Sequence, residues 1–223
     1  MPAARCPHPD CRSLVEVQAL LRDQDCPACS RRIRPRPVDH EARLQERRRQ
    51  AGDRGVPPLG PDSVCLLLED VRSLWNVGSA FRTADGLGAA HLFLCGITGI
   101  PPHPQVHETA LGAEEVVSWS YHPHAFEALG ILRDRGVPLV ALERTPRSRP
   151  LHEVRLRRPL CLVLGHEPGG VSPEVLEACD PHVEIPMQGV KESLNVAVVA
   201  GIALHWFARG PGASGEAAGK GGA

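Results

Sequence analysis

The sequence predicts an α/β fold: a parallel β-sheet with helices on both faces, preceded by a small N-terminal module. Short continuous apolar runs, typical of strands buried on both faces, alternate with helix-length segments in the larger part of the chain. Four cysteines form two close pairs near the N-terminus. Hydrophobic residues make up 42% of the chain, which suits a globular core, and aromatics only 4%, which argues against an aromatic platform that stacks single-stranded RNA.

Composition divides the chain into four parts. Residues 1–38, rich in Cys, Arg and Pro, form a zinc-ribbon-like module. Residues 39–61 begin with a polar, basic helix (39–50) and continue as a Gly/Pro linker. Residues 62–209 form the large α/β domain, and residues 210–223 are a low-complexity tail that we expect to be disordered.

Within the large domain, the apolar runs predict six strands, and the segments between them predict five helices. Ser172 followed by Pro173 is a helix start signal, because Ser caps a helix and Pro suits its first position. The expected strands are Val64–Glu69, His91–Cys95, Glu115–Ser118, Pro138–Leu142, Pro159–Leu164 and His182–Ile185. The expected helices are Val77–Leu87, Val106–Leu111, Pro123–Arg135, Pro173–Ala178 and Ser193–Phe207.

The N-terminal cysteines are candidates for a structural zinc site. Cys6 and Cys11 are separated by four residues, Cys26 and Cys29 by two, and fourteen residues lie between the pairs. Two close pairs at this distance suit a tetrahedral site with four thiolates, although His8 could replace one of them. The alternative is a set of incidental reduced thiols. A zinc ribbon by itself leaves open whether the module binds RNA, binds a protein or caps the domain.

The other four cysteines, Cys65, Cys95, Cys161 and Cys179, are scattered, and we expect them to be buried thiols rather than a disulfide framework. The sequence has no N-terminal signal-like apolar segment and no run of about 18 apolar residues. We therefore expect a soluble, cytoplasmic protein that does not associate with a membrane.

Charge is unevenly distributed along the chain. Residues 1–58 hold twelve Arg and no Lys against eight acidic residues, a net charge of +4, whereas the rest has thirteen basic and eighteen acidic residues, a net charge of −5. An Arg-rich run from Arg31 to Arg54 is thus the part of the chain expected to attract an RNA backbone. The alternative is a solvated face of a linker.

Three clusters in the large domain carry the candidate chemistry. The first, NVGSAFRT, begins at Asn76, follows a strand and places Arg82 on the next helix. The second, LGHEPGGVS, begins at Leu164, where a buried strand ends in a Gly-rich loop; ligands of parallel sheets bind beyond such strand ends. The third, IPMQGVKESLNVA, begins at Ile185 and leads into a strongly apolar helix. Each cluster alone also has a simple structural interpretation. The first could hold an exposed Arg on a helix, the second an ordinary turn, and the third a helix cap.

Together and in this order, the clusters closely resemble the SpoU family of the knotted SPOUT methyltransferases, over about residues 62–208. Pro101-Pro102 and the stretch from Thr109 to Glu114 are also similar to that family. The resemblance implies a C-terminal trefoil knot, S-adenosylmethionine as methyl donor and a ribose 2′-hydroxyl of a structured RNA, tRNA or rRNA, as acceptor. It also implies a homodimer that associates through the knot region.

The resemblance also assigns site residues. Arg82 is the expected essential residue, either as a general base or, because a guanidinium stays protonated, as a cation that orients phosphate and stabilises the developing alkoxide. Asn76 holds Arg82 or the ribose. The remaining catalytic-site residues, expected to organise the site and the knot loops, are Glu167, Ser193 and Asn195. The expected cofactor-binding residues are Gly165, Ile185, Leu194, Leu142, Glu143 and Met187.

Two positions depart from the family pattern: His166 stands where Asn is common, and Glu108 where many relatives carry Lys. We expect His103, His107, His122 and His124 to be exposed, without a second metal site. A competing function is a non-catalytic zinc-ribbon factor that binds RNA or assists assembly and retains the methyltransferase fold. Methylation of a base is a further alternative, against which the Arg82 motif argues.

Overall fold

The computed structural model describes residues 3–5, 11, 14–16, 24–30, 32–33, 55–166 and 168–212. The chain divides into two compact units, Met1–Gly52 and Asp53–Ala223. The predictions that concern Cys6, Glu167, the helix 39–50 and the tail from residue 213 onward lie outside the described residues.

The N-terminal unit contains two short antiparallel strand pairs. β1 (Ala3–Arg5) pairs with β2 (Leu14–Glu16), and β3 (Gln24–Asp25) pairs with β4 (Arg32–Ile33). Cys26 and Cys29 lie in the tight turn between β3 and β4, where the Ser30 amide donates to the Cys26 carbonyl at 2.8 Å.

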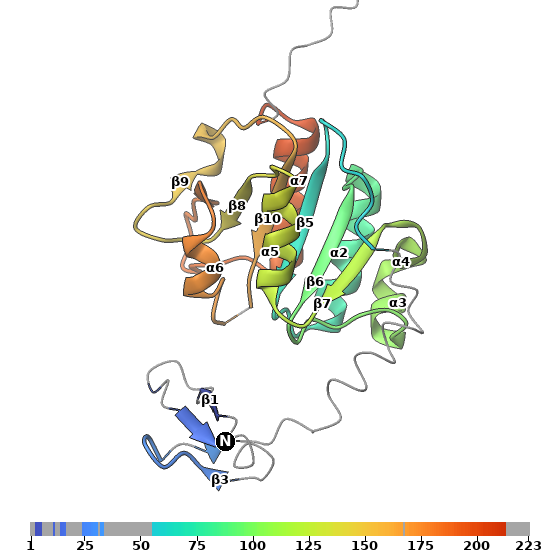
Figure 1. Ribbon diagram of the computed structural model, residues 1–223. Helices are drawn as coiled ribbons and strands as arrows, with labels where there is room; N and C mark the ends of the chain where they lie inside the picture. Colours follow the sequence, from blue (N-terminus) through green and yellow to red (C-terminus); the bar gives the residue numbers. More distant parts are fainter. Residues whose placement is uncertain are drawn as a thin grey trace, which may run out of the picture. The chain divides into compact units, whose positions relative to one another are not determined.

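The C-terminal unit is built on a seven-stranded sheet in the order β7-β6-β5-β10-β8-β11-β9 (Figure 1). Every strand pair of this sheet is parallel, which confirms the predicted sheet type. The late strand β10 lies between β5 and β8, so the carboxyl ends of early and late strands meet at one edge. The strands are β5 (Val64–Glu69), β6 (His91–Cys95), β7 (Trp119–His122), β8 (Leu139–Leu142), β9 (Arg149–Pro150), β10 (Leu160–Leu164) and β11 (His182–Glu184).

Helices cover both faces of the sheet, as predicted. α5 and α6 pack over one face, and α2 and α7 pack against each other over the opposite face (Figure 1). The helices are α2 (Leu74–Leu87), α3 (Pro104–Ala110), α4 (Ala113–Val116), α5 (Ala125–Asp134), α6 (Pro173–Glu177) and α7 (Val196–Leu204), with a 3₁₀ turn η2 (Leu151–Glu153) and a π-helical turn η3 (His205–Arg209).

The core follows from the strand patterns. All residues of β5, β6 and β10 are buried, because both faces of these strands are covered. Alternate residues such as Cys65, Phe93 and Val163 join the core under α5 and α6. The expectation that Cys65, Cys95, Cys161 and Cys179 are core thiols is confirmed.

Helix boundaries are set by capping residues. Ser73 accepts from the Asn76 amide at the start of α2, and Gly88 ends that helix with φ of +72°, a conformation that glycine adopts without strain. Ser172 caps α6 and Pro173 occupies its first turn, as predicted. Asn195 caps α7 through its side chain, which accepts from the Ala197 amide at 2.8 Å.

The predicted strand Glu115–Ser118 is wrong. The chain forms the short helix α4 up to Val116, and the strand β7 begins only at Trp119. Leu111 and Gly112 both have positive φ, so the chain turns sharply and starts a new helical turn instead of extending. His122 was expected to be exposed, but it lies in β7 and is buried with its Nε2 2.8 Å from Ser120 Oγ.

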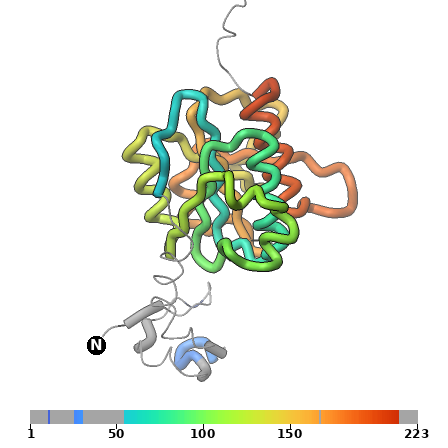
Figure 2. The backbone as a smooth tube through the Cα atoms, turned by 90° about the vertical axis from the view of Figure 1, so that its right-hand side faces the viewer, coloured from blue at the N-terminus to red at the C-terminus, as the bar shows by residue number. Residues whose placement is uncertain are grey.

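The helix of the last apolar segment begins at Val196, later than the predicted Ser193, and continues through the π-helical turn η3 to Arg209. Ser193–Asn195 belong to the loop before α7, because the Asn195 side chain satisfies the first helical amides. The loop between β11 and α7 projects from the body of the domain (Figure 2). Val190, in the middle of this loop, is 99% exposed. Among the described residues, no helix is long and apolar enough to cross a membrane.

The segment before β5, part of the expected linker, packs on the domain. Val56 and Leu59 contact the core cluster, and the Arg135 guanidinium donates to the carbonyls of Val56 and Pro57 at 3.1 and 2.7 Å. These contacts order a Gly/Pro-rich stretch that has no regular secondary structure.

Candidate active site

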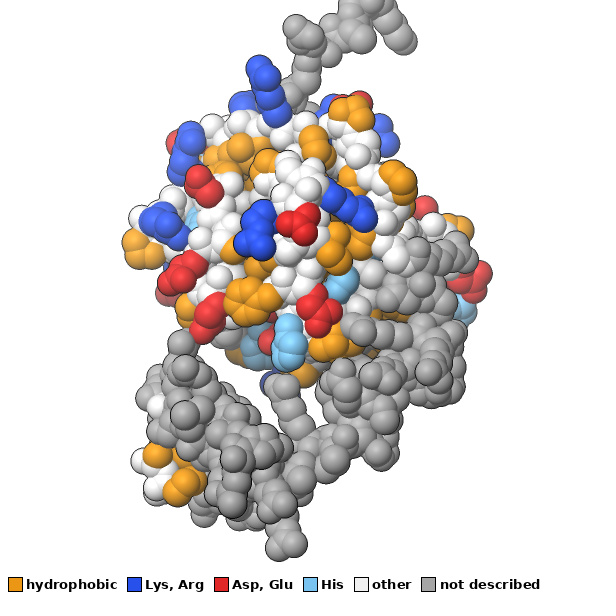
Figure 3. Space-filling view, viewed as in Figure 1, with side chains coloured by type: hydrophobic (Ala, Val, Ile, Leu, Met, Phe, Trp, Pro, Cys, Tyr) orange, Lys and Arg blue, Asp and Glu red, His pale blue; other side chains and the backbone are white. Residues whose placement is uncertain are grey.

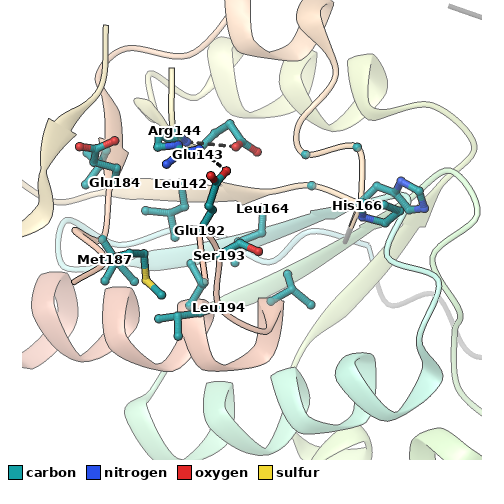
Figure 4. A pocket seen from close by; sticks show the side chains of 18 residues that line it. Leu142, Glu143, Arg144, Leu164, His166, Glu184, Met187, Glu192, Ser193 and Leu194 are labelled. Atoms are coloured by element: carbon teal, nitrogen blue, oxygen red, sulfur yellow. Dashed lines mark hydrogen bonds and ion pairs between the residues drawn. The ribbon is translucent and has the colours of Figure 1, made fainter. Parts of the chain in front are cut away.

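A cavity of about 400 Å³ lies at the carboxyl edge of the sheet, where the segments after β8, β10 and β11 converge (Figure 4). This is the edge at which parallel α/β sheets bind ligands, and the volume is within the range of small-molecule sites. Its lining combines apolar side chains with charged and other polar groups. The described residues that line it are Leu142, Glu143, Arg144, Leu164, Gly165, His166, Pro168, Gly169, Gly170, Val183, Glu184, Ile185, Met187, Glu192, Ser193, Leu194, Val196 and Val199.

The wall after β10 is a tight turn that requires glycine. The His166 amide donates to the Gly170 carbonyl at 3.1 Å, and the Gly170 amide returns a bond to the His166 carbonyl at 2.8 Å. A Cβ on Gly165 would lie 2.2 Å from backbone atoms of Gly170 and Val171. The two ends of the turn therefore touch through backbone alone, and there is no room for a side chain at Gly165.

Two carboxylates hold this turn in place. Glu143, directly after β8, accepts from the Val171 amide at 3.1 Å and from the Arg144 amide at 3.0 Å. Glu69, at the end of β5, accepts from the Ser172 amide at 2.9 Å and from Ser172 Oγ at 2.7 Å. Burial raises the pKa of the Glu69 carboxyl, although both bonds from Ser172 act in the opposite direction.

The wall after β11 carries more charge. Arg144 Nη2 lies 2.9 Å from the Glu192 carboxylate, and this exposed ion pair joins the segment after β8 to the loop after β11 (Figure 4). Glu184 accepts from Ser148 Oγ at 2.9 Å. Met187 and Leu194 approach the cavity from the side of α7 (Figure 4).

The first and third sequence clusters meet beside the cavity. Asn195 Nδ2 donates to Asn76 Oδ1 at 2.9 Å, which connects the start of α7 to the first turn of α2. Arg82 lies on α2, two turns further on, and is exposed; it does not line the cavity of its own chain. The Arg82 guanidinium is therefore on a helix that neighbours the cavity, but it does not contact the cavity within one chain.

All six predicted cofactor residues line the cavity, as does Ser193. Asn76 and Asn195 contact each other outside its lining, Arg82 stands apart, and Glu167 is not among the described residues. Sequence reasoning missed further lining residues in the same segments, which their position beside the motifs could have indicated. They include Arg144, Leu164, Pro168, Gly170, Val183, Glu184 and Glu192.

The composition of the lining indicates what kind of ligand the cavity can hold. Apolar side chains suit a ring system, and carboxylates suit a cationic ligand. His166, which is also in the lining, has a buried Nε2 without a hydrogen-bond partner among the described residues. These features fit S-adenosylmethionine, which has an aromatic base, a polar tail and a positively charged sulfonium.

The cysteines of the N-terminal unit are arranged as metal ligands are. Cys11 Sγ and Cys26 Sγ are 3.8 Å apart, and the sulfur atoms of Cys11, Cys26 and Cys29 all lie within 4.8 Å of one another. A tetrahedral zinc site with Zn–S bonds of about 2.3 Å has sulfurs separated by about 3.8 Å. A disulfide needs about 2.05 Å. The separation of Cys11 and Cys26 fits two ligands of one zinc ion.

Comparison with known proteins agrees with the site. Residues 63–205 match the model of the SpoU rRNA Methylase family. The chain is 34% identical to a tRNA (guanosine(18)-2′-O)-methyltransferase of Thermus thermophilus over 144 residues, which cover 65% of this chain and 73% of that protein. It is 36% identical to the 23S rRNA (guanosine-2′-O-)-methyltransferase RlmB of Nitrosomonas europaea over 148 residues, 66% of this chain and 56% of that protein.

Solved structures give the same result. The SpoU methyltransferase AviRb of Streptomyces viridochromogenes, in complex with the cofactor AdoMet, is similar with a TM-score of 0.64 and 26% identity. That match covers 68% of this chain and 62% of AviRb, so this chain spans less than two thirds of that relative and of RlmB. The family match, the parallel sheet and the cavity built from the motif loops lead to one conclusion. The chain belongs to the SpoU rRNA Methylase family.

Proposed function

We propose that this protein transfers a methyl group from S-adenosylmethionine to a ribose 2′-hydroxyl of tRNA or rRNA. One observation carries the proposal: the loops that hold the second and third sequence clusters enclose a single cavity, and the third cluster is hydrogen-bonded to the first through Asn195 and Asn76. The relatives from Thermus thermophilus and Nitrosomonas europaea are named as guanosine 2′-O-methyltransferases of tRNA and of 23S rRNA.

When bound, S-adenosylmethionine would supply an electrophilic methyl group. As the 2′-oxygen bonds to the methyl carbon, the carbon–sulfur bond breaks and the hydroxyl proton passes to solvent water. Gly165, which has no side chain, lines the cavity wall with its backbone, and Ile185, Leu142, Met187 and Leu194 add apolar residues to the lining. Holding the donor and the hydroxyl in line supplies much of the acceleration in such a transfer. Ser193 lies where it can contact the donor or the ribose.

Arg82 acts in this proposal as a cation that binds an RNA phosphate and stabilises the alkoxide as it forms. Its exposed position on α2 leaves the guanidinium accessible to a large substrate. A general-base role requires a neutral guanidinium, which is scarcely populated in proteins. Asn76 and Asn195 keep α2 and α7 in register, so that Arg82 has a fixed relation to the cavity.

The test is methyl transfer from labelled S-adenosylmethionine to total RNA, followed by nucleoside analysis. Label in 2′-O-methylated nucleosides is the expected result. Label in a base would exclude the ribose assignment. No label in any RNA, from protein that binds the donor, would favour the competing function of a non-catalytic RNA-binding or assembly factor.

We also propose a homodimer that associates through the knot region. Leu194, Val198 and Ile202 recur every fourth residue and are 37%, 49% and 38% exposed, and Trp75 on the adjacent helix α2 is 47% exposed. A stripe of this kind on a packed helix is typical of a surface that another molecule covers. The trefoil knot itself remains a proposal, supported by β10 lying between β5 and β8 and by the convergence of the loops after β10 and β11.

The dimer makes it possible that Arg82 of one copy serves the cavity of the other. Light scattering should give twice the chain mass, and Val198→Glu should halve it by placing charge in the apolar stripe. Mixing Arg82→Ala chains with Gly165→Ala chains should restore part of the activity if the site combines two copies. A monomeric wild-type chain would exclude this arrangement.

For the N-terminal unit we propose a structural zinc ion held by Cys11, Cys26 and Cys29, with Cys6 as the fourth ligand. The sulfur positions fit, and a small unit with little apolar core needs such support. Metal analysis of protein prepared without chelator should find zinc at about one per chain, the stoichiometry of a Cys₄ site. Absence of zinc would favour incidental thiols.

RNA affinity is assigned in this proposal to the Arg-rich run from Arg31 to Arg54. On the face of the large unit shown in Figure 3, acidic and basic side chains are interspersed, so that face has little net attraction for an RNA phosphate backbone. Because arginines would then supply the affinity for RNA by contacting phosphates, this affinity should fall steeply as the salt concentration rises. Reduced buried thiols such as Cys65 and Cys161 are compatible with the cytoplasm, where we propose that the protein works.

A further inference from the structure

The turn between α3 and α4 brings together three side chains that the function above does not use. His107 Nδ1 lies 2.5 Å from Glu114 Oε1, and the ligand atoms of His107, Glu114 and Glu115 are all within 4.8 Å of one another. Leu111 and Gly112, both with positive φ, reverse the chain so that the start of α4 faces the last turn of α3. The sequence analysis expected no second metal site, because it placed His107 in an exposed segment and did not bring it near Glu114.

Glu114 is the unusual member of the cluster. Its side chain is only 7% exposed, and its Oε2 is buried with no hydrogen-bond partner among the described residues. A buried carboxylate oxygen without a partner is costly. Within the described part of the chain, the ion pairs found include no Lys or Arg with Glu114 or Glu115. The imidazole of His107, itself 66% exposed, is the one basic group placed on this carboxylate there.

We propose that His107, Glu114 and Glu115 bind one divalent first-row metal ion, of the kind represented by Mn²⁺ or Zn²⁺. One imidazole and two carboxylates are a ligand set such ions accept, with remaining positions filled by water. The metal takes the place of the proton shared between His107 and Glu114, and it gives Glu114 Oε2 a positive partner.

The location connects the site to RNA binding, and this part rests on the proposed function. α3 packs on α2, where Thr109 Oγ1 donates to the Trp75 carbonyl at 3.2 Å and Gly78 touches the α3 backbone. The ion therefore lies beside the helix that carries Asn76 and Arg82. Because two of the three ligands are exposed, a metal with open positions can accept a phosphate oxygen from RNA.

The test measures Mn²⁺ binding to the full chain. The readout is the loss of the electron paramagnetic resonance signal of free Mn²⁺. The protein is prepared without chelator, so that the zinc proposed for the cysteine thiolates is not removed. Thiolates are soft ligands and compete poorly for Mn²⁺. Wild-type protein should bind one Mn²⁺ per chain. His107→Gln and Glu115→Gln, which change exposed side chains, should each weaken binding by about tenfold or more.

Glu108→Gln is the matched control, since it removes the same charge from an exposed position of α3 outside the cluster. Its Mn²⁺ affinity should stay within about twofold of wild type, as for an ordinary surface substitution. The metal site is excluded if His107→Gln and Glu115→Gln bind Mn²⁺ as well as wild type. It is also excluded if wild type binds no Mn²⁺ and metal analysis finds no more than the one zinc per chain proposed for the N-terminal unit. Binding that is present while methyl transfer to RNA is absent would overturn the proposed function and leave the metal site standing.

Discussion

Asn195 and Asn76, 119 residues apart in the sequence, form a hydrogen bond of 2.9 Å between the starts of helices α7 and α2. Both polar atoms of the Asn195 side chain form hydrogen bonds: its amide nitrogen donates to Asn76 Oδ1, and its oxygen accepts from the Ala197 backbone amide. A single residue thus caps one helix and fixes the position of the other. The helix it fixes carries Arg82.

Asn195→Asp should separate these two roles. The carboxylate still caps α7, but it cannot donate to Asn76, so stability should fall by about 1 kcal/mol, the contribution of one hydrogen bond. Asn195→Ala should cost up to about 2 kcal/mol more, because the cap is also lost. Urea unfolding of both variants, of Asn76→Ala and of the double variants measures the coupling. Strictly additive effects of Asn76→Ala and Asn195→Asp would show that the bond has no stabilising role.

Arg82→Ala should abolish methyl transfer and leave the affinity for S-adenosylmethionine unchanged, because Arg82 does not line the cavity of its chain. Isothermal titration with the donor and a single-turnover assay with RNA measure the two quantities. Arg133→Ala, an exposed Arg on α5, is the control and should keep activity within about twofold. Weakened donor binding in Arg82→Ala would mean that the guanidinium belongs to the cavity.

Gly165→Ala should remove donor binding. The new Cβ would lie 2.2 Å from the Gly170 backbone. To relieve this clash, the end of β10 and the turn would have to move apart, which would open the cavity wall. Gly189→Ala is the matched control in the loop after β11, since no atom lies within 4 Å of its Cβ position. Donor affinity should be within about twofold of wild type there, as at a free surface position. Equal affinity of both variants would contradict the described geometry of the turn.

The ion pair between Arg144 and Glu192 should contribute little. The two side chains are 61% and 78% exposed, and exposed pairs stabilise by about 0–1 kcal/mol. Glu192→Gln should therefore weaken donor binding less than about fivefold, and high salt should erase the difference by screening. Stopped-flow dissociation of the donor at low and high salt measures this. A large, salt-independent loss would mean that Glu192 contacts the donor itself.

His91 should make stability depend on acid pH. Burial, with smaller effects of the nearby His122 and Arg135, lowers the pKa of His91 from 6.5 to about 3. Between these values the unfolded chain binds a proton that the folded chain does not, so stability falls as pH drops from 6.5 toward 3, by about 1.4 kcal/mol per pH unit. The contribution is fully present above pH 6.5.

His91→Gln should flatten this slope in urea unfolding between pH 7 and pH 5, because a neutral amide can still bond Ser118 and Ser120, each 2.8 Å from the His91 ring. His124→Gln, at an exposed position, should leave the slope as in wild type. An unchanged slope in His91→Gln would assign the acid sensitivity to other groups.

Much of the fold could be predicted from local pattern. The runs at Val64–Glu69, His91–Cys95 and Leu160–Leu164 are strands because continuous apolar residues must be covered on both faces. Ser172 and Pro173 start a helix because their preferences act within one turn of chain. The predicted strand Glu115–Ser118 was wrong because its conformation depends on the preceding turn. The positive φ angles of Leu111 and Gly112 direct the chain into the short helix α4.

By itself, the sequence determined the α/β class, the parallel sheet, the family and part of the cavity lining, since each depends on a short stretch of chain or on a motif. Tertiary structure alone decided what meets across long separations: the bond between Asn76 and Asn195, the cavity shared by three strand ends, Arg82 outside that cavity, and His107 beside Glu114. The physical reason is that hydrophobic periodicity specifies which face of an element is buried, whereas side-chain partners depend on chain reversals and strand order that periodicity leaves open.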